Sequence, residues 1–242
     1  MPKSKVILEA INGEVPLEQT LRRLAALAND IDNDELSIWA EHELTGYRDA
    51  KLPSYRIVSS LSFSYSGINT CLNVSNASLS ISLLDKETVE GLKEIAVKEP
   101  ISSIYRSSTL GPVLHIDRSF LATEVSRNSG SAIRCTQIKQ NIPAAAYETI
   151  LAEVTNRSIK ALTLLEEQYG SLDDLGLTVS SPRAAALTNA NINKLVLDLG
   201  AVPQAKESTH SKFVWNVVAP IVTGILVAVI GAYIMNRLGI QN

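Results

Sequence analysis

Apolar residues recur along this chain at two spacings, and the change of spacing marks the predicted elements. From Pro16 to Ile31 they follow the three- and four-residue spacing of a helix. A second helical pattern follows the acidic segment 30–35, which offers N-cap residues, and ends at Thr45 and Gly46. Because so few residues connect them, the two helices are predicted to form an antiparallel hairpin.

The next part of the chain predicts strands. From 61 to 65 apolar side chains alternate with serines, which is typical of a strand with one buried face. Two further strands are predicted over 72–74 and 79–83, around a turn at 75–77. The short apolar pieces between 101 and 138 are interpreted as strands or loops.

Two more helices are predicted downstream. One begins at Asp85 and keeps apolar residues on one side as far as Ala96, before Pro100. The other, the longest, opens at Pro143 and runs to Gly170. The predicted fold class is therefore mixed α+β, with an N-terminal helical hairpin, a small sheet and a long helix.

A continuous apolar run from Phe213 to Met235 differs from all of these elements, because its only ionisable side chain is the weakly acidic Tyr233. A helix rises about 1.5 Å per residue and a bilayer core is roughly 30 Å thick, so the run is long enough to span with some tilt. Trp215 and Tyr233 lie near its ends, where amphipathic rings prefer the headgroup layer. We therefore predict one C-terminal transmembrane helix, with a buried or interfacial hairpin as the alternative.

The predicted organisation has four segments. A soluble α+β domain covers 1–170, a linker with one short ordered piece near 192–199 covers 171–212, the membrane helix covers 213–235, and a short tail covers 236–242. The amino terminus lacks the unbroken apolar stretch of a secretory signal. We therefore expect a cytoplasmic domain that a single pass tethers to the inner membrane.

Candidate chemistry is sparse. His42, His115 and His210 are far apart and near no cysteine or clustered acid, so they do not have zinc-ligand spacing. Cys71 and Cys135 fit reduced thiols. The sequence shows neither a glycine-rich phosphate loop nor a nucleophile elbow. We expect no catalytic residue, no cofactor, no metal and no enzymatic activity. The formal net charge of −3 argues against direct nucleic-acid binding, which needs a basic face.

One stretch, residues 36–56, stands out. Its pattern consists of Trp39, Glu43, Gly46, Tyr47, Pro53, Tyr55 and Arg56. This pattern resembles the AbiTii domain of bacterial abortive-infection and conflict systems, and the resemblance covers roughly residues 5–170. It implies a role in antiphage defence and brings no catalytic motif with it.

Physically, the same residues are interpreted as architecture. Trp39 would pack beneath the hairpin and Gly46 would end a helix. Pro53 would send the chain into the sheet, and Arg56 would pair with Glu43 or another acid. A partner-binding surface is the alternative interpretation.

The apolar run also contains a pattern for helix association. Gly224, Ala228 and Ala232 are four residues apart and Gly231 widens that face, so two helices could approach closely. Asn216 can hydrogen-bond across a helix pair, which contributes about 0.6 kcal/mol. Together with the resemblance, this pattern favours a membrane-anchored effector that assembles after a trigger and disrupts the inner membrane.

Two other functions stay open at this point. The chain could be a tail-anchored adaptor that recruits a sensor or partner protein to the membrane, or a membrane-bound hydrolase. The partners expected are the lipid bilayer, further copies of the chain, and a sensor protein encoded nearby, Argonaute-like or other.

Overall fold

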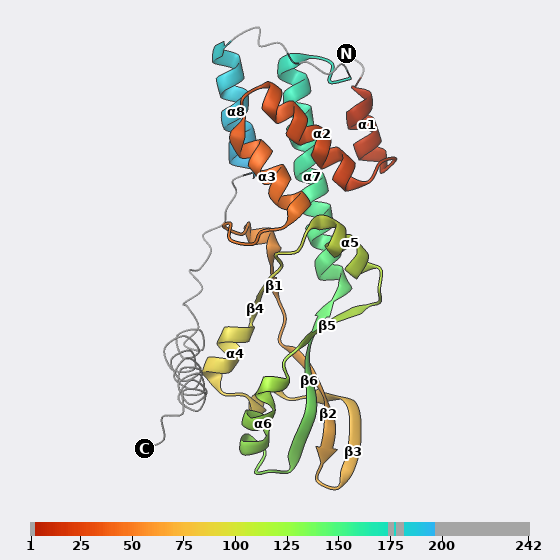
Figure 1. Ribbon diagram of the computed structural model, residues 1–242, viewed down its shortest axis with the longest axis vertical. Coiled ribbons are helices and arrows are strands. Elements are labelled where there is room, and N and C mark those ends of the chain that lie inside the picture. The colour runs from red at the N-terminus through yellow and green to blue at the C-terminus, as the bar shows by residue number, and fades with distance from the viewer. Residues whose placement is uncertain (1–2, 174–176, 178–181, 197–242) are drawn as a thin grey trace, which may run out of the picture. The chain divides into compact units, whose positions relative to one another are not determined.

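The computed structural model of this protein describes residues 3–173, 177 and 182–196 (Figure 1). These residues form helices and strands in a mixed order. The α-helices are α1 (Lys5–Asn12), α2 (Leu17–Asp30), α3 (Asp34–Thr45), α4 (Lys86–Leu92), α5 (Ile101–Ser108), α6 (Ala122–Asn128), α7 (Ala144–Tyr169) and α8 (Pro182–Val196). The strands are β1 (Ile57–Ser59), β2 (Ser62–Asn69), β3 (Leu72–Leu79), β4 (Glu94–Ala96), β5 (Val113–Asp117) and β6 (Ile133–Pro143). Short 3₁₀ turns are η1 (Ser54–Arg56), η2 (Ile81–Leu83) and η3 (Ser119–Leu121).

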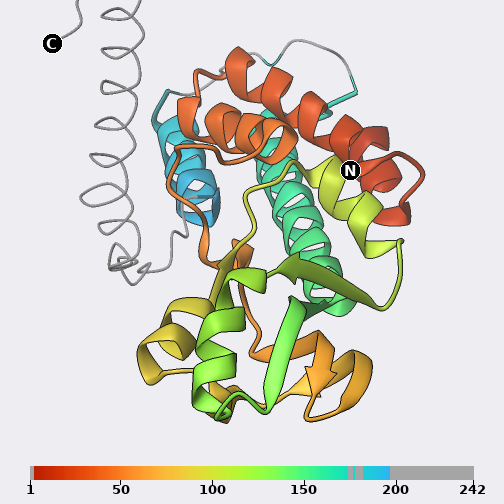
Figure 2. The ribbon, with the colours of Figure 1, turned by 60° about the horizontal axis from the view of Figure 1, so that its bottom comes forward.

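The helical part is arranged around α7. Helices α1, α2, α5 and α8 all contact α7, while α3 contacts α2, α5 and α8 (Figures 1 and 2). Leu21 and Leu24 of α2, Leu36 of α3, and Ile150 and Leu162 of α7 are among its fully buried side chains. Burying such side chains stabilises each by about 1.5–3 kcal/mol, so the core, more than helix propensity, holds these short helices.

The predicted hairpin and long helix are confirmed as elements. Helix α3 begins where the Asn33 side chain accepts a hydrogen bond from the Leu36 amide at 3.0 Å. Helix α7 starts after Pro143, whose missing N–H costs nothing at a helix start, and ends at Gly170 with a φ of 84°.

The second part of the fold is an antiparallel sheet in the order β3-β2-β6-β5. Helices α4 and α6 lie on the same side of this sheet (Figures 1 and 2). Apolar residues from this face of the sheet and from the helices, which we call the sheet core, pack together. The sheet core comprises Phe63, Tyr65, Leu79, Leu84, Leu92, Leu121, Val125 and Ile138.

A two-stranded ladder, β1 with β4, lies between the two parts (Figure 1). Val58 pairs with Ile95, and both side chains belong to the core of the helical part. The fold is thus the predicted α+β class, with one core among the helices and another under the sheet.

The prediction of two strands around a turn at 75–77 is wrong. One strand, β3, runs through this segment, with a bulge where its register against β2 shifts. Asn76 has a φ of 52°, and its amide donates to the Ser66 hydroxyl at 3.2 Å. The bulge absorbs the turn-like residues without ending the strand. The predicted end of the second strand forms the 3₁₀ turn η2 instead.

The helix predicted from Asp85 to Ala96 is too long. Helix α4 ends at Leu92, one residue after Gly91, which lowers helix propensity. Ile95 and Ala96 lie in β4 instead, because this strand pairs with β1.

The interpretation of 101–138 as strands or loops is correct for β5 and for the first half of β6 but wrong for two segments. Ile101 and Ile104 lie on one face of α5, and both are buried. Leu121 lies in η3 directly before α6, and Val125 lies within α6. Both side chains pack into the sheet core. Spacings of three and four are helical, but in such short pieces tertiary packing selects the state.

The segment predicted as a linker contains α8, which is longer than the expected short piece. Its Ile192 and Val196 are buried in the helical core. Among the described parts of the chain, no helix is both long and apolar enough to cross a membrane. The predicted transmembrane helix 213–235 and the tail 236–242 lie outside the described residues.

Candidate functional site

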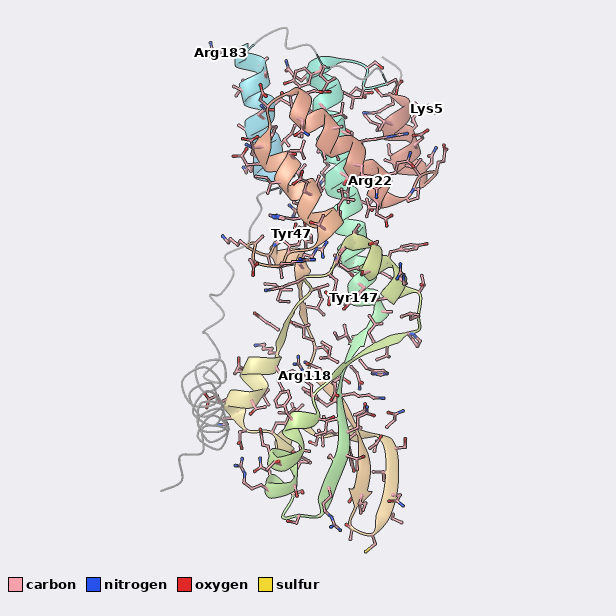
Figure 3. The ribbon with its side chains drawn as sticks, in the orientation of Figure 1. Lys5, Arg22, Tyr47, Arg118, Tyr147 and Arg183 are labelled. Carbon is pink, nitrogen blue, oxygen red and sulfur yellow. The ribbon has the colours of Figure 1, made fainter. Side chains whose placement is uncertain are left out.

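Residues of the 36–56 stretch meet at the end of the helical part, where the chain leaves α3 and enters β1. Figure 3 shows Tyr47 at this position. Five side chains contact one another there and form what we call the junction cluster: Trp39, Glu43, Tyr47, Tyr55 and Arg56.

The Glu43 carboxylate is the centre of the junction cluster. One oxygen accepts hydrogen bonds from the hydroxyls of Tyr47 at 2.7 Å and Tyr55 at 2.6 Å. The other oxygen pairs with the Arg56 guanidinium. Both charged side chains are 0% exposed. The sequence suggested Glu43 or another acid as the partner of Arg56, and in the structure Arg56 pairs with Glu43.

Arg56 links this carboxylate to a distant segment. Its Nη1 donates to the carbonyl of Glu99 at 2.6 Å and to that of Val97 at 3.3 Å. The guanidinium carbon also lies 5.0 Å from the centre of the Tyr47 ring, within cation–π range. A buried cation is stable only when it is paired and hydrogen-bonded. Nη1 and Nη2 of Arg56 meet this need, whereas its buried Nε has no hydrogen-bond partner in the described part of the chain.

The cluster also reaches α7. The Trp39 indole donates to the Tyr55 hydroxyl at 2.9 Å, and the Arg157 guanidinium of α7 lies 4.8 Å from the centre of the Tyr55 ring. Arg157 further donates to the Leu195 carbonyl at the end of α8. The contacts therefore connect α3, η1, the segment that follows β4, α7 and α8.

Burial and the Glu43 charge set the protonation of the two phenols. Two effects raise the pKa of Tyr47 and of Tyr55 well above their ordinary values. Desolvation is the larger effect, and repulsion from the Glu43 carboxylate is the second. Both phenols stay protonated and serve as hydrogen-bond donors. Glu43 and Arg56 at the centre of the cluster are 0% exposed, which favours the architectural interpretation of these residues over a partner-binding surface.

Gly46 and Pro53 shape the backbone around the cluster. Gly46 has a φ of 91°, and a Cβ at this position would lie 2.7 Å from the Lys98 carbonyl oxygen. The Tyr47 amide donates to the same carbonyl at 2.8 Å. Pro53 precedes η1 in an extended conformation and leads the chain toward β1.

Sequence reasoning missed the partners of the cluster from outside residues 36–56. The carbonyls of Val97 and Glu99 have no side-chain signature, since any residue supplies a carbonyl. Arg157 could be recognised only once its burial in α7 was known, because a buried arginine needs partners.

The other candidate residues are not brought together. The His42 ring lies near the Tyr47 ring at an interplanar angle of 44°, with 5.1 Å between ring centroids. His115 bonds through Nδ1 to Asn141 Oδ1 at 2.9 Å, on the sheet face opposite the sheet core. Cys71 and Cys135 are free thiols, and burial raises the pKa of Cys135. Within the described ranges, no group of three or more histidine, cysteine or acidic residues could hold a metal ion.

A surface groove of about 560 Å³ lies between the α1–α2 turn, α5 and α7. The apolar part of its lining includes Leu17, Ile101 and Leu151. Its carboxylates come from Glu14 and Glu18. The groove is thus separate from the junction cluster, and its lining contains no histidine or cysteine.

The residues predicted for the membrane span and for helix association lie outside the described residues. They are Trp215, Asn216, Gly224, Ala228, Gly231, Ala232 and Tyr233.

The comparisons with known proteins give one match. The family model AbiTii matches residues 4–227. This range is wider than the 5–170 over which the sequence resemblance was recognised, and it includes α8 and the first part of the apolar run. Neither a curated protein nor a solved structure matches the chain.

Proposed function

Because the chain belongs to the AbiTii family, we propose that it is a membrane-anchored effector of a bacterial antiphage defence system. Membership of this family indicates a role in abortive infection. The proposal adds a location and a mechanism. The chain is held at the inner membrane with its α+β domain in the cytoplasm. It disrupts that membrane when several copies assemble after a trigger.

The observation that carries the proposal is the extent of the family match. The matched range ends at residue 227, inside the apolar run 213–235, so the family model covers sequence from both the α+β domain and the run. A run of this length without strongly charged side chains is typical of a membrane helix. The match therefore supports a functional unit that includes the run.

Assembly is required by the geometry of a single helix. One apolar helix cannot line an aqueous path through lipid, because it has no polar face to offer the water. Several copies are needed, and the small residues Gly224, Ala228 and Ala232 offer a face for close approach.

The α+β domain is proposed to act without chemistry of its own. A buried polar constellation in this domain, the junction cluster, directs its hydrogen bonds inward to other protein groups. Such a network stabilises a rigid body that can present surfaces to other copies.

A substitution inside the run tests the proposal. We expect the intact chain, expressed alone or with its trigger, to depolarise cells. The double substitution Gly224→Leu with Ala228→Leu should abolish depolarisation while leaving membrane insertion intact, because leucine side chains hold the helices apart. A membrane-potential dye reports the first property, and carbonate extraction of membranes reports the second.

Val227→Leu with Ile230→Leu is the matched control, since it alters neighbouring positions that are already large. Depolarisation should persist in it. Killing retained by residues 1–205 alone would contradict the proposal. Membrane insertion without depolarisation under any trigger would favour the adaptor that recruits a partner protein.

A further inference from the structure

One edge of the four-stranded sheet is open in the described part of the chain. There, β3 pairs with β2 alone, so no other strand lies along its second side. On that side, alternate backbone N–H and C=O groups of an edge strand offer hydrogen bonds to another strand. At eight residues, β3 is also longer than the usual strand.

The side chains of β3 do not protect this edge. Proteins commonly block an edge strand with charged residues, proline or a β-bulge, or keep it very short. The sequence of β3 is LNVSNASL, with neither charge nor proline. The opposite edge strand, β5, is five residues long and carries His115 and Asp117. Of these devices, the described β3 edge carries only the bulge at Asn76, which leaves the strand residues on either side of it regularly paired with β2.

We propose that β3 pairs antiparallel with β3 of a second copy of this chain, about a two-fold axis between Ser75 and Asn76. The strand is self-complementary in that register. Leu72 then faces Leu79 of the second copy, and Val74 faces Ala77 of the second copy. Pairs of this kind, apolar against apolar on one face, stabilise a sheet.

The polar residues match in the same register. Asn73 faces Ser78 of the second copy, and Ser75 faces Asn76 of the second copy. The bulge residues therefore lie opposite one another at the axis. Shifting the register by one residue would place apolar side chains against polar ones and lose this match.

Pairing also explains an exposed leucine. Leu72 is 71% exposed, whereas Leu79 is 4% exposed and belongs to the sheet core. Both side chains project from the same face of the sheet, since they pair with Asn69 and Phe63 at matching positions of β2. In the paired strands, Leu72 lies beside Leu79 of the second copy and extends that copy's sheet core.

The contact is weak by itself, which suits a triggered assembly. One strand pair buries less than the roughly 1,200–2,000 Å² of a stable interface. Anchoring to a membrane raises the effective concentration of the strands, and this part of the inference rests on the proposed function. A two-fold contact closes after two copies, so larger assemblies require a second contact, such as the one proposed within the apolar run.

Disulfide trapping in the full chain tests the register. In a Cys71→Ser, Cys135→Ser background, the chain receives Asn73→Cys and Ser78→Cys, both at exposed positions. Residue 73 then faces residue 78 of the second copy at two places, so mild oxidation of membranes should give a covalent dimer. Either substitution alone should give at least several-fold less dimer, because neither position faces itself. Val113→Cys with Asp117→Cys on β5 is the matched control and should stay monomeric.

Charge substitutions test the same contact without oxidation. Asn73→Lys with Ser78→Lys sets like charges against each other, whereas Asn73→Glu with Ser78→Lys sets opposite charges together. The positions are matched, since Asn73 and Ser78 each lie two strands from a basic residue of β6, Arg134 and Lys139 respectively. We expect chemical cross-linking of the Glu/Lys chain to exceed that of the Lys/Lys chain about 2- to 10-fold.

The outcomes separate this inference from the proposed function. Equal cross-linking of both charge variants, or no dimer from the double cysteine variant, would overturn strand pairing. If cells still depolarise in that case, the proposed function stands without it. A trapped dimer in cells that never depolarise would support the pairing and count against the membrane lesion.

Discussion

At the scale of single residues, the junction cluster is held by one buried ion pair. Glu43 and Arg56 are both 0% exposed, and the transfer of such charges from water costs several kcal/mol per ion. Two tyrosine hydroxyls and two backbone carbonyls offset that cost by hydrogen-bonding the carboxylate and the guanidinium. Removing either charge would leave the other as an uncompensated buried ion.

Removing the negative charge should therefore destabilise the fold strongly. Glu43→Gln keeps the shape of the side chain but leaves Arg56 as an uncompensated buried cation. We expect the free energy of unfolding to fall by about 3–5 kcal/mol, measured by chemical denaturation of the full chain with tryptophan fluorescence. Trp39, which donates to Tyr55, makes this signal sensitive to the cluster itself.

The matched control is Glu41→Gln, because Glu41 lies in the same helix and is exposed. Its effect should stay within about 0.5 kcal/mol. If the two substitutions cost the same, the buried pair is not what stabilises this junction.

At the scale of elements, helix ends decide where the chain turns. Gly46 ends α3 with a φ of 91°, and Gly170 ends α7 with a φ of 84°. A side chain strains both conformations, but the surroundings differ. A Cβ at Gly46 would meet the Lys98 carbonyl oxygen at 2.7 Å, while one at Gly170 would meet no atom within 4 Å.

Alanine substitutions at the two positions should therefore distinguish the cost of backbone strain, which both share, from the cost of a steric clash, which only Gly46 has. Gly170→Ala should cost about 1–3 kcal/mol, because its φ and ψ lie in a region that is essentially confined to glycine. Gly46→Ala should cost at least twice as much, because the segment holding Lys98 and Glu99 must also move. Thermal unfolding of both variants measures the difference, and equal shifts in Tm would contradict the close approach at Gly46.

At the scale of the whole molecule, the start of the described chain is fastened to the end of α7. Glu166 accepts hydrogen bonds from the Ser4 amide at 2.5 Å and the Ser4 hydroxyl at 2.6 Å, and it lies 3.3 Å from the Lys3 ammonium. The Ser4 hydroxyl in turn accepts from the Leu172 amide at 2.9 Å. One carboxylate thus joins segments that are far apart in the sequence.

This carboxylate should contribute to stability in a pH-dependent way. The Ser4 hydroxyl bond, more than any other contact, holds the pKa of Glu166 below its ordinary value, against the opposing effect of burial. A lowered pKa means that the stabilisation is complete above the unfolded value of about 4.3 and is lost as the pH falls through the folded value. Glu166→Gln should flatten the loss of stability between about pH 5 and pH 3.

Urea denaturation at a series of pH values measures this slope. The neighbouring, exposed Glu167 provides the control Glu167→Gln, in which the slope should be kept. Part of the slope should remain in Glu166→Gln as well, since the Arg23 hydrogen bond also lowers the pKa of Glu9. An unchanged slope in Glu166→Gln would contradict the role given to the Ser4 contact.

Sequence reasoning succeeded for elements whose signal is local and long. The pattern after Pro16 and the pattern after Pro143 each repeat over several helical turns, so α2 and α7 could be recognised without knowing their neighbours. It failed where an apolar piece is short. Ile101 with Ile104 is compatible with a helix or a loop, and only packing against α7 selects α5.

The candidate site divides in the same way. Every member of the junction cluster came from one short stretch of sequence, because α3 and η1 bring residues 39 to 56 together locally. The remaining partners, the carbonyls of Val97 and Glu99 and the side chain of Arg157, come from segments tens of residues away. A carbonyl has no sequence signal, so these contacts could not be predicted.

By itself, the sequence determined the α+β class, the helical hairpin, the long helix and the family resemblance, because each is written in local periodicity or in one compact motif. The tertiary structure alone decided that β3 continues through its bulge as an uncharged edge strand of the described sheet, that α8 belongs to the core, and that Glu43 and Arg56 are buried away from water. These features depend on which distant segments come to lie side by side. Hydrogen bonding and burial between such segments produce no periodic pattern in the sequence, so they could not be predicted from it.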